Sequence, residues 1–220
     1  MKYIKVYALF LMLVFCTSCG GQNKPDLPKE NIKPETKDTV TSPGSNEKYH
    51  TKYEYTDSTG KGLIIQNSFP RGGLTYADPS GKVYVYAIFW TRITNETATP
   101  VKCTIDFPAD SFELPSSADR YFKLFLPADT MTLEKEHLFN YGLADLKSYL
   151  DTGLNRPSSL KRTIDPKESS SFYVITLFNK GVDGTLRTGL GLKEQDLFYR
   201  INDKEIHCGK INLKNLILKK

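Results

Sequence analysis

Residues 82–94, KVYVYAIFWTRIT, decide the fold. The run is rich in β-branched and aromatic residues and contains neither Gly nor Pro, which predicts a long β-strand. Side chains of a strand point alternately to opposite faces. One face then carries Val83, Val85, Ala87, Phe89 and Ile93, and the other carries Tyr84, Tyr86, Ile88, Trp90 and Arg92. We expect the first set to face the core.

Similar runs recur between residues 62 and 208. We expect strands at residues 62–69, 82–94, 101–107, 121–126, 170–178, 185–192, 196–201 and 204–208. Turn residues separate them: Asp78-Pro79-Ser80-Gly81 suits a type I turn, and Asn202-Asp203 suits a tight hairpin. Residues 49–55 alternate tyrosine and threonine with polar side chains and predict a first, peripheral strand. Short, closely spaced strands favour an all-β, antiparallel sandwich.

One segment has the pattern of a helix. Residues 144–151, ADLKSYLD, place Leu146 and Leu150 on the same stripe as Leu143, and Gly153 follows as a stop. The sequence therefore predicts one short helix, in a single domain of residues 60–220.

Two phrases resemble the immunoglobulin-like domains of exported bacterial proteins. They are residues 93–110, ITNETATPVKCTIDFPAD, and residues 163–178, TIDPKESSSFYVITLF, in which a polar turn and a strand adjoin. The resemblance implies an antiparallel immunoglobulin-like β-sandwich with one short helix. It implies no activity, because fold alone does not fix function.

The amino-terminus has the pattern of a cleaved export signal. Lys2 and Lys5 precede an apolar run that ends near Phe15, which is long enough for a secretory signal and too short for a membrane-spanning helix. Ser18-Cys19-Gly20 then resembles the lipobox of bacterial lipoprotein precursors, especially of Bacteroidota-type bacteria. The resemblance implies a signal peptide of residues 1–18 and lipidation of Cys19. Gly20 is not the Asp that retains lipoproteins at the inner membrane, so we expect an outer-membrane lipoprotein that faces the periplasm or the cell surface.

A tether follows the lipidated cysteine. Residues 19–59 contain four prolines and alternating charges up to about Asn46, with few large apolar side chains, which is typical of a flexible linker. Removal of residues 1–18 takes away Lys2 and Lys5, so the formal net charge falls from +5 to +3. Such a small excess predicts no nucleic-acid partner. Thr39, Ser58 and Thr130 match a permissive Asp-Ser/Thr-apolar signal for O-glycosylation in Bacteroidota-type bacteria.

The sequence carries no recognisable catalytic fingerprint. His50, His137 and His207 are isolated from one another, so we expect no metal and no cofactor. Ser58-Thr59-Gly60-Lys61 and Ser158-Ser159-Leu160-Lys161 match the Ser-x-x-Lys pattern of penicillin-interacting enzymes, but the companion Ser-x-Asn element is missing. We therefore expect no catalytic residues and no enzyme.

Besides the lipidated Cys19, only Cys103 and Cys208 remain after signal removal, both on expected strands. An oxidising compartment permits a disulfide between them, and two buried free thiols are the alternative.

The second face of residues 82–94 supplies the candidate ligand site. Tyr84, Tyr86, Trp90 and Arg92 combine flat apolar rings with a hydrogen-bond donor, which suits a glycan or a protein partner. The alternative is that residues 144–151 or 49–55 cover this face.

We expect an exported, lipid-anchored envelope protein that acts as a non-enzymatic binding or structural module. An envelope hydrolase and a docking subunit of a surface assembly are the alternatives.

Overall fold

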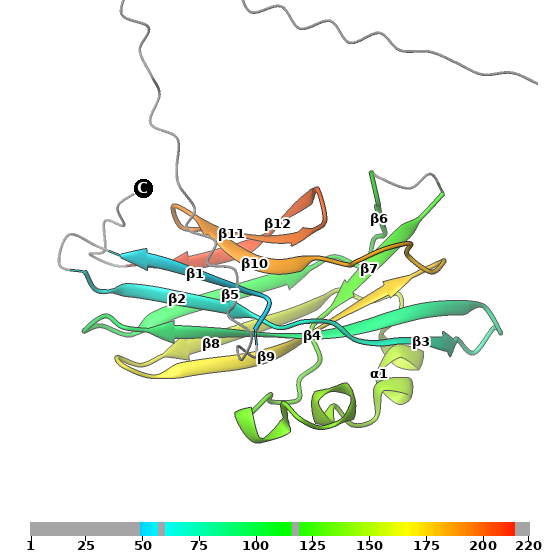
Figure 1. Cartoon of the computed structure of the whole chain (residues 1–220), viewed down its shortest axis with the longest axis horizontal. Helices are drawn as coiled ribbons and strands as arrows, with labels where there is room; N and C mark the ends of the chain where they lie inside the picture. The colour runs from blue at the N-terminus through cyan, green and yellow to red at the C-terminus, as the bar shows by residue number, and fades with distance from the viewer. Residues whose placement is uncertain (1–48, 57–59, 116–118, 214–220) are drawn as a thin grey trace, which may run out of the picture. The chain divides into compact units, whose positions relative to one another are not determined.

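The computed structural model describes residues 49–56, 60–115 and 119–213. These residues form antiparallel β-sheets with one α-helix, which confirms the expected all-β class (Figure 1). The strands are β1 (Thr51–Thr56), β2 (Gly62–Asn67), β3 (Arg71–Ala77), β4 (Val83–Asn95), β5 (Val101–Phe107), β6 (Phe112–Glu113), β7 (Tyr121–Phe125), β8 (Ser158–Ile164), β9 (Ser169–Phe178), β10 (Thr188–Lys193), β11 (Asp196–Ile201) and β12 (Lys204–Asn212). The helices are the 3₁₀ turns η1 (Leu133–Lys135) and η2 (Phe139–Gly142) and the α-helix α1 (Leu146–Gly153).

The strands form two sheets. The larger sheet has the order β1-β2-β4-β9-β7-β6, with β3 paired to the first half of β4, and the smaller sheet has the order β10-β11-β12-β5-β8. The long β4 organises the larger sheet, because β3 and β2 share one of its edges in succession while β9 pairs along the other.

The two sheets enclose one apolar core. Leu63 and Phe89 of the larger sheet join Ile105 and Tyr199 of the smaller sheet in this core, and all four are at most 2% exposed. Ala87, Phe89 and Ile93 face this core as the alternation predicted, whereas Val83 is 54% exposed and Val85 lies outside the core.

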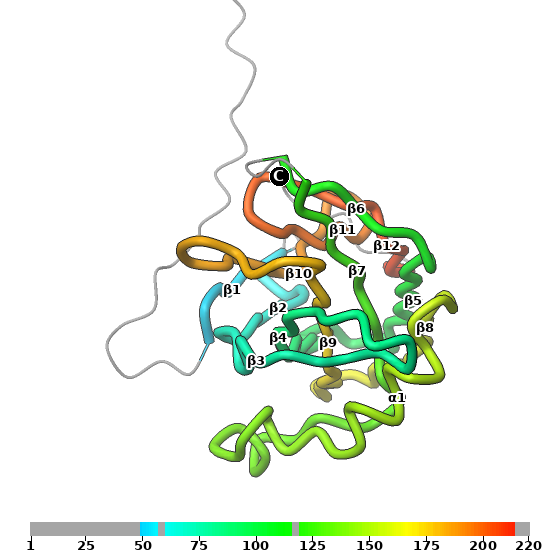
Figure 2. The backbone as a smooth tube through the Cα atoms, turned by 90° about the vertical axis from the view of Figure 1, so that its right-hand side faces the viewer, coloured from blue at the N-terminus to red at the C-terminus, as the bar shows by residue number. Residues whose placement is uncertain are grey.

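The second face of β4 is covered. The candidate ligand site on this face is therefore not an open aromatic strip but part of a second core. Tyr86 and Trp90 are only 7% and 3% exposed, and they pack with Leu150 of α1 and with Tyr141. The covering segment is residues 127–157, which carries η1, η2 and α1 and lies on the side of the larger sheet away from the smaller one (Figures 1 and 2). The helix therefore covers this face, as the alternative held.

The expected turns and all the expected strands are present. Asp78 closes the β3–β4 turn, because its carboxylate accepts hydrogen bonds from the backbone N–H groups of Ser80 and Lys82. Gly81 then takes the positive φ of 86° that this turn requires.

Three strands were not predicted from the sequence: β3, β6 and β8. The expected domain boundary at residue 60 also needs correction, because β1 pairs with β2 along its whole length and belongs to the sheet.

Candidate functional site

Three of the predicted modification sites lie outside the described residues. These are the lipidation site Cys19 and the glycosylation candidates Thr39 and Ser58. Thr130 is described, and it is exposed between β7 and η1, where its backbone N–H donates to Asp129.

The two cysteines are buried and free. Cys103 lies opposite Ile211 in the β5–β12 pair, so Cys208 is three residues away along the neighbouring strand. Three residues of strand span about 10 Å, whereas a disulfide needs Cα atoms within about 7 Å. Burial raises the pKa of Cys103 to about 12 and also raises the pKa of Cys208. In the structure, Cys103 and Cys208 are therefore two buried free thiols, as the alternative predicted.

The second Ser-x-x-Lys match lies on a strand. Ser158 and Lys161 belong to β8, where residues three apart point to opposite faces. The Ser158 hydroxyl instead accepts a hydrogen bond from the backbone of Leu126. The Ser158 hydroxyl therefore has a structural role at this position. Across residues 49–56, 60–115 and 119–213, no three His, Cys, Asp or Glu side chains are grouped closely enough to hold a metal ion.

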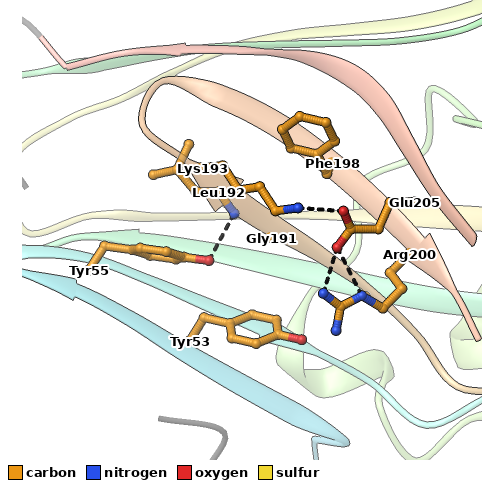
Figure 3. A pocket seen from close by; sticks show the side chains of 9 residues that line it. Tyr53, Tyr55, Gly191, Leu192, Lys193, Phe198, Arg200 and Glu205 are labelled. Atoms are coloured by element: carbon orange, nitrogen blue, oxygen red, sulfur yellow. Dashed lines mark hydrogen bonds and ion pairs between the residues drawn. The ribbon is translucent and has the colours of Figure 1, made fainter. Parts of the chain in front are cut away.

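The structure brings together a set of residues that the sequence analysis did not select. They line a notch between β1 and the strands β10, β11 and β12 (Figure 3). Aromatic rings form its walls, glycines its floor and charged side chains its rim: Tyr53, Tyr55, Phe198, Gly189, Gly191, Lys193, Arg200 and Glu205.

The floor exists because β10 alternates glycine with leucine. Leu190 and Leu192 are buried in the core, while Gly189 and Gly191 present bare backbone toward the larger sheet. A Cβ on Gly189 would lie 3.0 Å from the side-chain nitrogen of Asn67, and a Cβ on Gly191 would lie 3.6 Å from the Tyr55 hydroxyl oxygen. The two glycines therefore let β10 approach β1 and β2 closely.

Side chains join the edge of β10 to the larger sheet. The Asn67 carboxamide accepts from the N–H of Leu190 (2.9 Å) and donates to its carbonyl (3.1 Å). The N–H of Leu192 donates to the Tyr55 hydroxyl at 2.8 Å. Edge groups that another strand would normally satisfy are thus satisfied by side chains, and Tyr55 is fixed in place.

The rim is an ion cluster around one carboxylate. Lys193 donates to one oxygen of Glu205, and Arg200 donates to the other at 2.6 Å (Figure 3). These hydrogen bonds lower the pKa of Glu205, so the carboxylate stays ionised at neutral pH. Lys193 also lies 4.9 Å above the centre of the Phe198 ring, an arrangement favoured by the charge distribution of the ring.

The size of the notch limits which ligands it can bind. The cavity volume is about 30 Å³, which leaves room for only a few water molecules. A small-molecule pocket normally encloses several hundred Å³. The notch therefore suits the edge of a larger ligand that lies across the surface. An ionised Glu205 between two cations is also poorly suited to act as a general acid.

One signal for this site was present in the sequence. The alternation of Tyr53 and Tyr55 predicted a strand, but not which element their rings face. The Gly-Leu alternation of β10 was read only as a strand, and Phe198, Arg200 and Glu205 come together only through the β11–β12 hairpin.

Comparison of the chain with protein-family models, with curated proteins and with solved structures finds no match. In the part of the chain that the structure describes, no helix has the length and apolar character needed to cross a membrane.

Proposed function

We propose that the protein is an exported, lipid-anchored protein of the cell envelope that acts as a non-enzymatic binding module. The lipobox-like Ser18-Cys19-Gly20 supports the anchor, with the outer membrane as the expected location. The observation that carries the binding role is the notch, where aromatic walls and charged hydrogen-bonding groups meet over a glycine floor.

The chemistry of the notch favours an envelope polysaccharide as ligand. Tyr53 offers a ring face for the C–H groups of a sugar, Phe198 adds an apolar wall beside Lys193, and Arg200 and Glu205 offer charged partners for hydroxyl groups. The shallow shape fits a chain that lies across the surface with one ring edge inserted. This assignment replaces the face of Trp90, which the second core occupies.

For the architecture, we propose a relative of the immunoglobulin-like sandwiches. Two antiparallel sheets that share one core support this relation. The closure of β10 onto β1 and β2 departs from an open sandwich and curls the sheets toward a half-barrel.

Co-sedimentation with an insoluble envelope polysaccharide tests the binding role. The detergent-solubilised mature protein is mixed with purified peptidoglycan sacculi, and the bound fraction is measured. Phe198→Ala should weaken binding about tenfold, which corresponds to ~1.4 kcal/mol, because it removes one wall. Tyr121→Ala removes an exposed aromatic ring outside the notch and should leave binding unchanged. Equal binding by both variants, or no binding by the unaltered protein, would overturn the assignment.

A further inference from the structure

We propose that an apolar patch on the covering segment is a second contact of this protein with the membrane that carries its lipid anchor. The inference rests on the proposed anchor at Cys19 and adds a surface of the folded domain to it. We call this surface the Phe139 patch. It consists of Phe69, Leu133, Leu138 and Phe139.

The four side chains are large, apolar and exposed. Phe139 is 70% exposed, Leu133 48%, Phe69 45% and Leu138 43%. Tyr141 joins the chain segments that carry them, because its hydroxyl donates to the Phe69 carbonyl at 2.6 Å and its N–H donates to the Leu138 carbonyl at 3.0 Å. Single exposed apolar residues are ordinary, whereas a group of them on one surface indicates a contact site.

The backbone holds Phe139 outward at an energetic cost. Asn140 and Tyr141, the next two residues, have positive φ values of 48° and 55°. The left-handed conformation is unfavourable for a bulky side chain such as that of Tyr141, whereas asparagine adopts it more readily. This turn sends Tyr141 into the second core, where the Tyr173 hydroxyl donates to its carbonyl at 2.8 Å, while Phe139 stays in solvent. Local strain of this kind is often retained where a side chain has a functional position.

The position of the patch favours the membrane as its partner. The described chain begins at Tyr49, and the ring of the next residue, His50, lies 5.3 Å from the ring of Phe69. The chain segment that comes from the proposed anchor therefore enters the domain beside the patch. A Pro-rich linker of about 30 residues has a reach of tens of Å, so the domain stays near the bilayer. Tethering then raises the effective concentration of the surface, and a weak patch suffices for contact.

Charged side chains of both signs border the patch, because Glu134 and Glu136 flank Lys135 next to Leu133. The Arg71 guanidinium lies 5.0 Å from the centre of the Tyr141 ring, and Lys135 pairs with Asp129. Both cations sit beside apolar side chains, an arrangement that suits the boundary between lipid headgroups and acyl chains.

Tryptophan placed in the patch can report on the lipid. The only native tryptophan, Trp90, is buried and serves as a constant background. Two lipidated variants, Phe139→Trp and Tyr121→Trp, are reconstituted into vesicles with and without brominated lipids, which quench tryptophan near the bilayer. The variants differ only in whether the second tryptophan lies in the Phe139 patch or on β7.

We expect vesicles to shift the emission of the Phe139→Trp variant to shorter wavelength, and brominated lipid to reduce it strongly. The Tyr121→Trp variant should show neither change. Equal quenching of both variants, or none of the Phe139→Trp variant while the protein remains on the vesicles, would overturn the patch proposal and leave the anchor intact. The latter result would favour a protein partner for the patch. Protein that does not stay with the vesicles at all would instead overturn the proposed anchor.

Discussion

At the scale of single residues, Asn67 links the two sheets. Its side chain is 2% exposed and uses every hydrogen-bonding position of a carboxamide. It donates to Thr51 and to the Leu190 carbonyl, and it accepts from Thr91 and from the Leu190 N–H. The partners lie on β1, β4 and β10, so one side chain replaces a strand-to-strand ladder at this corner.

Asn67→Ala should therefore destabilise the domain by about 3 kcal/mol, because it leaves buried backbone and hydroxyl groups without partners. Gln66→Ala alters the neighbouring residue on the opposite face of β2 and should change stability by no more than about 0.5 kcal/mol. Urea unfolding of both variants measures the difference. A loss in Asn67→Ala as small as that in Gln66→Ala would refute the linking role.

The buried thiols give a second residue-scale prediction. A raised pKa keeps Cys103 and Cys208 protonated at pH 8, and the thiolate is the reactive form. Both should resist iodoacetamide at pH 8 in the folded protein and react fully in denaturant without reductant. Peptide mapping identifies the labelled positions. If neither cysteine reacts in denaturant until reductant is added, a disulfide joins them.

Trp90 shows what residue patterns can and cannot predict. Alternation along β4 assigned the two faces correctly, because the opposite side chains of a strand must diverge. Which face meets solvent depends on the path of the covering segment, residues 127–157. The sequence of β4 alone gives no information about that path. Tyr86 and Trp90 were therefore candidates for a ligand site although α1 and its neighbours bury them.

At the scale of elements, β10 depends on its two glycines, and these differ in the space around them. A Cβ on Gly189 would meet Asn67 and the Thr51 hydroxyl at 3.0 and 3.2 Å, whereas a Cβ on Gly191 would make an ordinary contact of 3.6 Å with Tyr55. Gly189→Ala should destabilise the domain by about 1–3 kcal/mol through overpacking.

Gly191→Ala is the matched control, because the substitution also reduces the entropy of the unfolded chain without a close contact. It should be neutral or stabilising by up to about 1 kcal/mol. Thermal unfolding compares the two variants. The close approach of β10 would be contradicted if Gly189→Ala proved as stable as Gly191→Ala.

Strands with a clear alternation were predictable, and the others were not. The expected ranges of β5 and β11 agree with the structure at both ends. β3 was missed because Gly72 and Gly73 interrupt its pattern at a β-bulge, and most of its side chains are exposed. β8 was missed because only Leu160 and Ile164 face the core, so its sequence is mostly polar. Pairing with β4 and with β5 stabilises these two strands, and such long-range pairing leaves little local signal.

At the scale of the whole molecule, we propose a lipid anchor at Cys19 that is joined to a folded domain with two candidate contact surfaces. In these proposals, the notch contacts a polysaccharide and the Phe139 patch contacts the membrane. Both proposals place the domain in the envelope. Both therefore depend on the fate of Cys19.

The mass of the amino-terminal peptide of the mature protein tests this claim most directly. Cleavage before Cys19 and lipidation should give a peptide that begins at Cys19 and carries acyl chains. Cys16→Ala should be processed in the same way, whereas Cys19→Ala should give an uncleaved or unlipidated product. A native peptide that begins elsewhere, or that begins at Cys19 without lipid, would contradict the account.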